Sequence, residues 1–262
     1  VPEGGRVLVK PNWVFHANHT DGGIEPLLTH ATLIRAVTEA ALDAGAGKVT
    51  LGDAPLQSCQ FDTMVAAAGL TEWARDLAAR DSRFEGPEDF RRTVSTRDNG
   101  IRMAYEDLRP EEDFVLYDLG RDSLLEPISS GDPQFRVTQY DPRLLEERHH
   151  RGSHQYLVAR EAIEADLVIN LPKLKTHKKA GLTCALKNLI GINGNKEFLP
   201  HHRLGGSASG GDCYENGGPI RLALEKVMDR YNMADSIATA RAWRTLGRVA
   251  EWFARRLEGS AE

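Results

Sequence analysis

The chain has 262 residues, of which 41% are hydrophobic and 27% charged, and its formal net charge at pH 7 is -5. This charge argues against a nucleic-acid-binding protein, and the sequence contains no helix-turn-helix, RNP or zinc-finger pattern. No apolar run approaches the ~18 residues of a membrane-spanning helix, and the three cysteines are too scattered for a disulfide framework or an iron–sulfur cluster. We therefore expect a cytoplasmic protein, although the start at Val1 leaves room for a preceding targeting segment.

The amino-terminal part of the chain predicts a βαβ unit. Residues 7–9 and 49–51 are short apolar runs typical of buried parallel strands. The two strands of such a unit are parallel. Open α/β sheets bind ligands just beyond the carboxyl ends of their strands, which is where we expect Lys10, Asn12 and Asp53. Between the strands, Thr29 is a suitable N-cap for a helix that continues to about Ala44, with five inward positions at Leu33, Ala36, Val37, Ala40 and Ala41.

Two short helices are predicted next, at 61–68 and 71–79. From 81 to 155 the pattern weakens, and we interpret this segment as an irregular insertion or small subdomain with strands at 114–117 and 135–137. Asp141 and His154 could reach the site, but we interpret both as residues of solvated loops. We interpret His149, His150 and Arg151 as a basic surface run.

The stretch 165–203 concentrates lysine and histidine in a segment that otherwise has a buried pattern. It opens with an apolar run at 167–169, typical of a strand covered on both faces, which Pro172 ends. If the chain stays extended beyond Pro172, the period of two places Lys173, Lys175 and His177 on one side.

The apolar residues of this stretch then recur at helical spacing. They predict a short amphipathic helix over 182–190, with Lys187 and Asn188 on its polar face. Its packing stripe is expected at Leu182, Ala185, Leu186, Leu189 and Ile190. A loop and a glycine-rich segment follow, and two further helices are predicted at 220–231 and 234–257.

Together these residues predict an α/β enzyme with a mainly parallel sheet, flanking helices and a basic crevice for an anionic small molecule. The candidates for binding that molecule are Lys10, Asn12, Asp53, Lys173, Lys175, Asn188 and Lys196. Histidine titrates near neutral pH, and a partly buried lysine among other cations has a lowered pKa. The catalytic candidates are therefore Lys187, His177 and His201.

A metal site is an alternative interpretation. His202 and Asp212 are the candidate ligands, with His177, His201 and Asp53 as further nitrogen and oxygen donors for zinc, iron or nickel. Their spacing matches no standard metal signature, and the neighbouring lysines would repel a bare cation. A metal carried inside an anionic cofactor would escape that objection.

These motifs resemble those of the family known as domain of unknown function 362. The resemblance implies a single domain over residues 1–262 that lacks a carboxyl-terminal part, because members of the family usually continue past the last helix. Some members are fused to iron–sulfur ferredoxin modules, which implies a non-catalytic role beside a ferredoxin-like partner as a further alternative. The matching segments are Lys10-Pro11-Asn12, His30, Gly52-Asp53-Ala54-Pro55, Leu171-Pro172-Lys173, Lys175-Thr176-His177, Ala185-Leu186-Lys187-Asn188, Lys196 and Pro200-His201-His202.

A looser resemblance connects the chain to the nickel-pincer lactate racemases. It rests on lysines and histidines that are ordered around a glycine-rich turn and a Pro-His step. It implies a protein-bound metal cofactor that takes hydride from a 2-hydroxy acid, with lysine and histidine as its anchors.

Overall fold

The computed structural model describes residues 1–18, 22–98, 101–129, 135–137, 140–177, 180–215 and 218–258. The chain divides into two compact units. Unit 1 comprises Val1–Ser95, Tyr105–Val115 and Leu157–Lys196, and unit 2 comprises Thr96–Ala104, Leu116–Tyr156 and Glu197–Glu262. The segment predicted as an insertion, 81–155, therefore contributes to both units.

A parallel sheet of four strands forms the centre of unit 1. The strand order is β10 (Leu167–Leu171), β1 (Arg6–Pro11), β2 (Lys48–Asp53) and β3 (Phe84–Asp89). The three strands predicted from apolar runs are confirmed, and so is the α/β class. β3 was not predicted, because its sequence FEGPED carries a glycine, a proline and three acidic residues. β10 lies at the edge of the sheet and Val168 is 37% exposed, so the prediction that this strand is covered on both faces is wrong.

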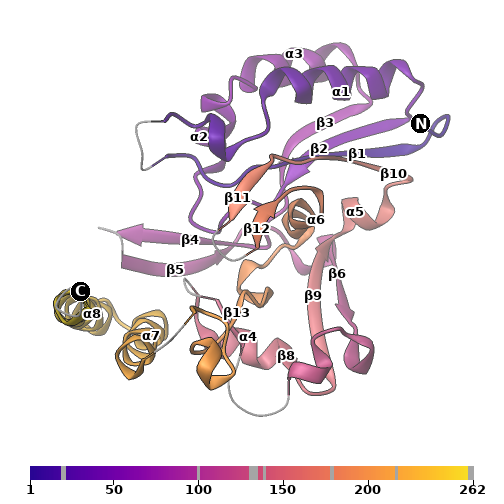
Figure 1. The fold of residues 1–262 in the computed structure, drawn as a ribbon. Coiled ribbons are helices and arrows are strands. Elements are labelled where there is room, and N and C mark those ends of the chain that lie inside the picture. Colours follow the sequence, from indigo (N-terminus) through magenta and orange to yellow (C-terminus); the bar gives the residue numbers. More distant parts are fainter. Residues whose placement is uncertain are drawn as a thin grey trace. The chain divides into compact units, whose positions relative to one another are not determined.

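Helices cover both faces of this sheet. α1 (Ala31–Asp43) and α3 (Thr71–Arg80) lie on one face, and α5 (Arg160–Glu164) and α6 (Ala185–Asn188) lie on the other (Figure 1). α2 (Phe61–Ala67) and α3 confirm the two short helices predicted in this region.

The start of α1 differs from the prediction. Its N-cap is His30, whose Nδ1 accepts a hydrogen bond from the Thr32 amide, and Thr29 is instead buried before the helix. The buried stripe of α1 is also displaced from the predicted one and consists of Ile34, Thr38, Ala41 and Leu42, while Leu33 is exposed. Thr29 does not cap α1, because its hydroxyl bonds instead to the Leu171 carbonyl at the end of β10 and to the Asn12 amide just after β1.

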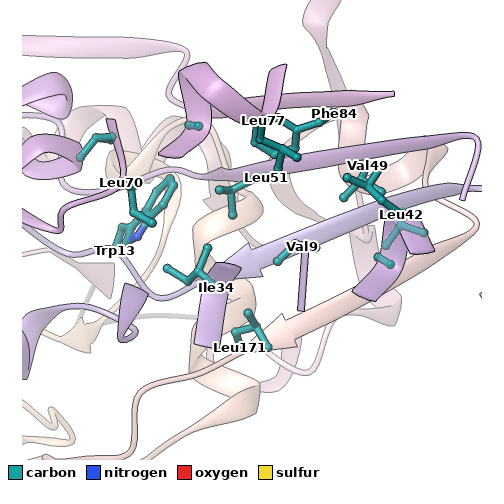
Figure 2. Close-up of a cluster of buried hydrophobic side chains, with 14 of the residues drawn as sticks. Val9, Trp13, Ile34, Leu42, Val49, Leu51, Leu70, Leu77, Phe84 and Leu171 are labelled. Carbon is teal, nitrogen blue, oxygen red and sulfur yellow. The ribbon is translucent and has the colours of Figure 1, made fainter. Parts of the chain in front are cut away.

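The hydrophobic core of unit 1 lies between the sheet and α1 to α3. Figure 2 shows Val9 and Leu51 of the sheet packed among Ile34 of α1 and Leu77 of α3. Burying each such side chain stabilises the folded state by about 1.5–3 kcal/mol. This packing fixes the positions of the strands, and hence of the polar residues at their carboxyl ends.

Several short elements complete unit 1. The strands β11 (Lys175–His177) and β12 (Gly181–Thr183) form an antiparallel pair. The 3₁₀ helices are η1 (Glu25–Leu27), η2 (Glu111–Asp113) and η5 (Leu189–Ile192).

Four elements contain residues of both units: β4 (Thr93–Asp98), β5 (Ile101–Asp107), β9 (Ser153–Ala159) and η6 (Lys196–Phe198). A fifth such element, β6 (Phe114–Asp118), confirms the strand predicted at 114–117.

Unit 2 combines three helices with short antiparallel strands. The helices are α4 (Pro142–Arg148), α7 (Pro219–Asn232) and α8 (Ile237–Glu258), and the last two confirm the predicted helices. β7 (Phe135–Arg136) pairs with β13 (His202–Arg203), and β8 (His149–His150) pairs with β9. Its 3₁₀ helices are η3 (Gly120–Asp122), η4 (Glu126–Ile128) and η7 (Ser207–Ser209). In the described part of the chain, no helix has the length and hydropathy that a membrane crossing requires.

Asp141 and His154 are buried, so their prediction as solvated loop residues is wrong, and so is the surface position predicted for His149, which is also buried. His150 and Arg151 of the predicted surface run are exposed. Asp141 caps α4 by accepting a hydrogen bond of 2.9 Å from the Arg143 amide. The β8–β9 register places His149 opposite His154, with 3.4 Å between their Nδ1 atoms. His149 Nε2 donates to the Phe198 carbonyl at 2.5 Å, and burial lowers the pKa of His149 to about 4.

Candidate functional site

The candidate site lies where β1, β2 and β10 of unit 1 reach their carboxyl ends. The parallel register places Lys10 beside Asn170 and Pro11 beside Leu171. Asn188, from α6, joins these two strands, because its buried amide nitrogen lies 2.7 Å from Asn170 Oδ1, 3.4 Å from the Lys10 carbonyl and 3.3 Å from the Pro11 carbonyl. The amide of Asn188 therefore holds α6 against the ends of the strands.

A buried ion pair lies at the centre of the site. Lys10 Nζ is 2.8 Å from Asp53 Oδ1 and 2.9 Å from the Pro11 carbonyl, and Lys10 is 0% exposed. Asp53 also accepts the backbone N–H groups of Trp13, at 2.7 Å, and Ala54, at 2.9 Å. The carboxylate is therefore surrounded by donors from the two strand ends that it joins.

Burial is the main influence on both charges of this pair. It raises the pKa of Asp53 and lowers the pKa of Lys10, and their mutual attraction opposes both shifts. The positive charge of Lys196 also acts to lower the pKa of Asp53. Lys196 is itself buried and donates to the carbonyls of Ile190 and Asn193, each at 3.0 Å. Lys196 thus braces the segment that follows α6 from within, and its charge acts on the buried Asp53.

Gly191 explains how this segment approaches the ion pair so closely. A Cβ atom at this position would lie 1.8 Å from Asp53 Oδ1 and 2.5 Å from Lys10 Nζ. The Gly191 carbonyl accepts a hydrogen bond of 2.8 Å from the Ala54 amide. Glycine is required here for close packing of the backbone on the ion pair.

A second chain of hydrogen bonds extends from the sheet to the surface. The Thr29 hydroxyl donates to the Leu171 carbonyl at 2.7 Å and accepts from the Asn12 amide at 2.8 Å. The Asn12 side chain donates to the Leu27 carbonyl, so its oxygen faces Lys175, whose Nζ donates to it at 2.8 Å. This series of hydrogen bonds orients the Lys175 ammonium beside the strand ends.

Lys175 is the centre of a group of lysines. Its pKa is lowered first by burial and then by the positive charges of Lys187, Lys173 and Lys10, while the charge of Asp53 acts in the opposite direction. Lys173 is half-buried. Lys187 lies on the exposed surface of α6, and partial burial of its ammonium lowers its pKa as well. The structure therefore gathers Lys173, Lys175 and Lys187 beside the ends of the strands.

His177 follows this group on β11. Burial alternates along the segment as the period of two predicts, with Lys173, Lys175 and His177 half-buried and the intervening residues exposed. His177 Nδ1 accepts a hydrogen bond of 3.1 Å from the Ala180 amide. In the neutral ring the proton is therefore on Nε2, so that His177 can offer this N–H as a donor.

The helix predicted over 182–190 is wrong in length and in orientation. Leu182 belongs to β12, α6 has one turn, and η5 follows it. The predicted packing stripe is largely exposed, with Leu186 at 88%, whereas Asn188 of the predicted polar face is buried. Hydrogen bonding of the Asn188 amide to the strand ends determines which side of α6 faces the protein, because a buried amide needs partners.

Three predicted site residues belong to unit 2. His201 is exposed, and its Nδ1 donates to the Leu199 carbonyl at 2.9 Å. His202 is half-buried on β13, and Asp212 is exposed. Three atoms that could bind a metal lie within 4.8 Å of one another: a ring nitrogen of His202, a carboxylate oxygen of Asp212 and the sulfur of Cys213. The structure therefore groups His202 and Asp212 and adds a cysteine that the sequence did not single out.

Comparison with known proteins identifies one family. The model of the family described as domain of unknown function (DUF362) matches residues 7–106 and 134–246. No curated protein and no solved structure matches the chain.

Proposed function

Since the chain belongs to the family described as domain of unknown function (DUF362), a description that assigns no activity, we propose a function from the chemistry of unit 1. Unit 1 binds an anionic small molecule, carboxylated or phosphorylated, beside the carboxyl ends of β1 and β10. The observation that carries this proposal is the environment of Lys175, whose pKa is lowered first by burial and then by the positive charges of Lys187, Lys173 and Lys10. Like charges in one place repel one another, and an anion bound among them relieves that repulsion.

The residues of the site divide into ligand-binding and supporting groups. Lys173, Lys175 and Lys187 are the cations that contact the ligand, because they are half-buried or exposed. Lys10, Asp53 and Lys196 are buried and bond to protein atoms, so they support the structure of the site and do not contact the ligand. Asn12 and Asn188 orient Lys175 and α6 through their amides.

The same environment supports acid–base catalysis. Because the pKa of Lys187 is lowered, a larger share of its amine is neutral near physiological pH than in an ordinary lysine. A neutral amine accepts a proton from the substrate, and the ammonium that forms then stabilises negative charge on the substrate. His177 donates its Nε2 hydrogen to a substrate oxygen. We therefore infer an enzyme in which Lys187 and His177 transfer protons.

A ligand screen with matched lysine variants tests this proposal. Inorganic phosphate and a panel of di- and tricarboxylates are added to the whole chain, and thermal stabilisation identifies binders. Isothermal titration then compares the wild type with Lys175→Gln, Lys187→Gln and the control Lys226→Gln, an exposed lysine of α7. We expect the first two variants to weaken binding by about 10-fold each, the equivalent of ~1.4 kcal/mol, and the control to bind as the wild type does.

Two outcomes would overturn the proposal. One is that no anion of the panel stabilises the wild-type chain. The other is that anions bind the Lys175→Gln, Lys187→Gln and Lys226→Gln variants equally well, which would show binding to general positive charge.

A further inference from the structure

The glycine-rich segment after His202 forms a closed loop in unit 2. The Asp212 amide donates to the Arg203 carbonyl and the Cys213 amide to the Gly205 carbonyl, each at 3.0 Å. These backbone hydrogen bonds return the chain to the end of β13, from which the loop started. As a result, Asp212 and Cys213, which lie nine and ten positions beyond the end of β13 in the sequence, have ligand atoms close to His202 in space.

Two glycines make this closure sterically allowed. Gly205 has a φ of +88°, a left-handed conformation that other residues rarely adopt. A Cβ atom on Gly211 would lie 2.2 Å from the Gly205 carbonyl oxygen. The glycines of this segment therefore allow the tight loop, and the loop determines where Asp212 and Cys213 are held.

The loop brings together three different metal-binding atoms. A ring nitrogen of His202, a carboxylate oxygen of Asp212 and Cys213 Sγ all lie within 4.8 Å of one another. Zinc binds such atoms at about 2.0–2.3 Å in tetrahedral geometry, so two ligand atoms of one ion are roughly 3.3–3.8 Å apart. The three atoms therefore lie near the spacing of a single site, and binding requires them to move closer together around the ion. We propose that His202, Asp212 and Cys213 bind a divalent transition-metal ion of the zinc class.

The choice of metal follows from the donor atoms. Sulfur and imidazole nitrogen favour zinc and its neighbours in the transition series, whereas magnesium and calcium select oxygen ligands. Binding replaces the thiol proton of Cys213 with the metal, and this proton passes to solvent. The positive charge of Arg136 acts on Cys213, and this guanidinium is itself paired with the carboxylates of Glu225 and Asp229.

Neighbouring groups hold two of the ligands in place. Arg203 donates its amide hydrogen to Asp212 Oδ1, which orients the carboxylate. The Cys213 thiol donates to the Arg203 carbonyl at 3.3 Å, and burial together with the nearby Glu225 carboxylate raises its pKa to about 12, so a metal must displace this proton to bind. Glu225 is in turn held by Arg136, at 3.1 Å, and by the Gly205 amide, at 3.1 Å. Outer groups of this kind orient metal ligands in many proteins, and their loss typically weakens metal binding by about 10–100-fold.

The proposed site opens onto a cavity of about 700 Å³ within unit 2. Both His202 and Cys213 line this cavity, together with Trp243, Arg221 and Arg244 of the two long helices. An ion with three protein ligands keeps a fourth position for water or a bound molecule, as catalytic zinc sites do. The arginines match a carboxylate or phosphate, so the cavity suits an anionic ligand that reaches the metal.

Metal titration of the whole chain tests this inference. The chain is purified without a histidine tag, treated with a chelator, kept reduced, and titrated with Zn²⁺ by calorimetry and with Co²⁺ by absorption spectroscopy. We expect one ion per chain and the charge-transfer absorption of a thiolate–Co²⁺ bond. Cys213→Ser should abolish that absorption, and Cys213→Ser and His202→Gln should each weaken Zn²⁺ binding at least about 10-fold.

Matched variants separate this site from other thiols and histidines. Cys184→Ser removes an exposed cysteine of unit 1, and His150→Gln removes an exposed histidine of unit 2. Both should bind one Zn²⁺ as the wild type does. The inference is overturned if the wild type shows no thiolate–Co²⁺ absorption, or if Cys184→Ser removes it while Cys213→Ser does not. Absence of the thiolate–Co²⁺ absorption from the wild type overturns the inference whether or not the variants fold.

Discussion

Lys10 Nζ and Asp53 Oδ1 are 2.8 Å apart inside unit 1, and their side chains are 0% and 3% exposed. These residues lie in the first and second strands of one βαβ unit, and the parallel pairing of β1 with β2 brings them together. Two charges that are removed from water stabilise the fold only as a pair, because either one alone is costly to bury.

Lys10→Met leaves the Asp53 carboxylate buried without its cation. We expect it to lower the free energy of unfolding by about 3–5 kcal/mol. The double variant Lys10→Met/Asp53→Asn should lose less than the sum of the two single variants, because it buries no uncompensated charge. Urea unfolding followed by circular dichroism measures all four proteins.

The exposed pair of Lys48 and Glu85, 2.6 Å apart, supplies the control for this cycle. Lys48→Met should change the free energy of unfolding by no more than about 1 kcal/mol, since surface ion pairs contribute little. Strict additivity of the Lys10 and Asp53 variants would contradict a coupled pair.

Gly191→Ala should destabilise the chain, because the added Cβ would overlap Asp53 Oδ1 and Lys10 Nζ. Overpacking of this kind costs about 1–3 kcal/mol. Gly247→Ala, in the middle of α8, is the contrasting substitution. A Cβ at this position would lie 3.5 Å from the Val227 side chain of α7, which is an ordinary van der Waals contact. Alanine is the better helix former, so Gly247→Ala should raise stability by up to about 1 kcal/mol. Thermal unfolding of the two variants should therefore shift in opposite directions, and a neutral Gly191→Ala would show that η5 does not press on the ion pair.

Acid should destabilise the chain through His149. Burial lowers its pKa from 6.5 to about 4 in the folded state. Between these two values the unfolded chain binds a proton at this residue and the folded chain does not, so the free energy of unfolding falls as the pH decreases. The stability contributed by neutral His149 is present above pH 6.5, and up to roughly 3 kcal/mol of it is lost by pH 4.

Unfolding by urea across this pH range checks the His149 prediction. His149→Gln keeps a donor for the Phe198 carbonyl and should flatten the pH dependence. His150→Gln, at the exposed neighbouring position, should leave it unchanged. An equal pH dependence in the wild type and His149→Gln would assign the acid sensitivity to other groups.

The parts of the fold that the sequence predicts well are those set by local pattern. The apolar runs at 7–9, 49–51 and 167–169 become three strands of one parallel sheet, because burial of such runs is favourable in any parallel arrangement. The alternation of Lys173, Lys175 and His177 likewise follows from the geometry of an extended chain.

The remainder depends on contacts between distant segments. Thr29 and Gly191 have no local signal for their roles, which arise from the approach of Leu171 and Asp53. The segment 182–190 has the apolar spacing of a helix, but the hydrogen bonds of Asn188 outweigh it and leave Leu186 exposed. The burial of His149 and His154 depends on the β8–β9 register, which the sequence pattern does not reveal.

The most direct test of anion binding by unit 1 is competitive labelling of its lysines. An amine-reactive reagent attacks the neutral amine, so Lys175 and Lys187, whose pKa values are lowered, should react earlier than Lys226 at mildly alkaline pH. Mass spectrometry of peptides gives the rate at each lysine, with and without an excess of a binding anion such as phosphate. The proposal predicts fast labelling of Lys175 and Lys187 that the anion suppresses, and no effect of the anion on Lys226. Equal labelling of all three lysines, with no protection by any anion of the panel, would contradict it.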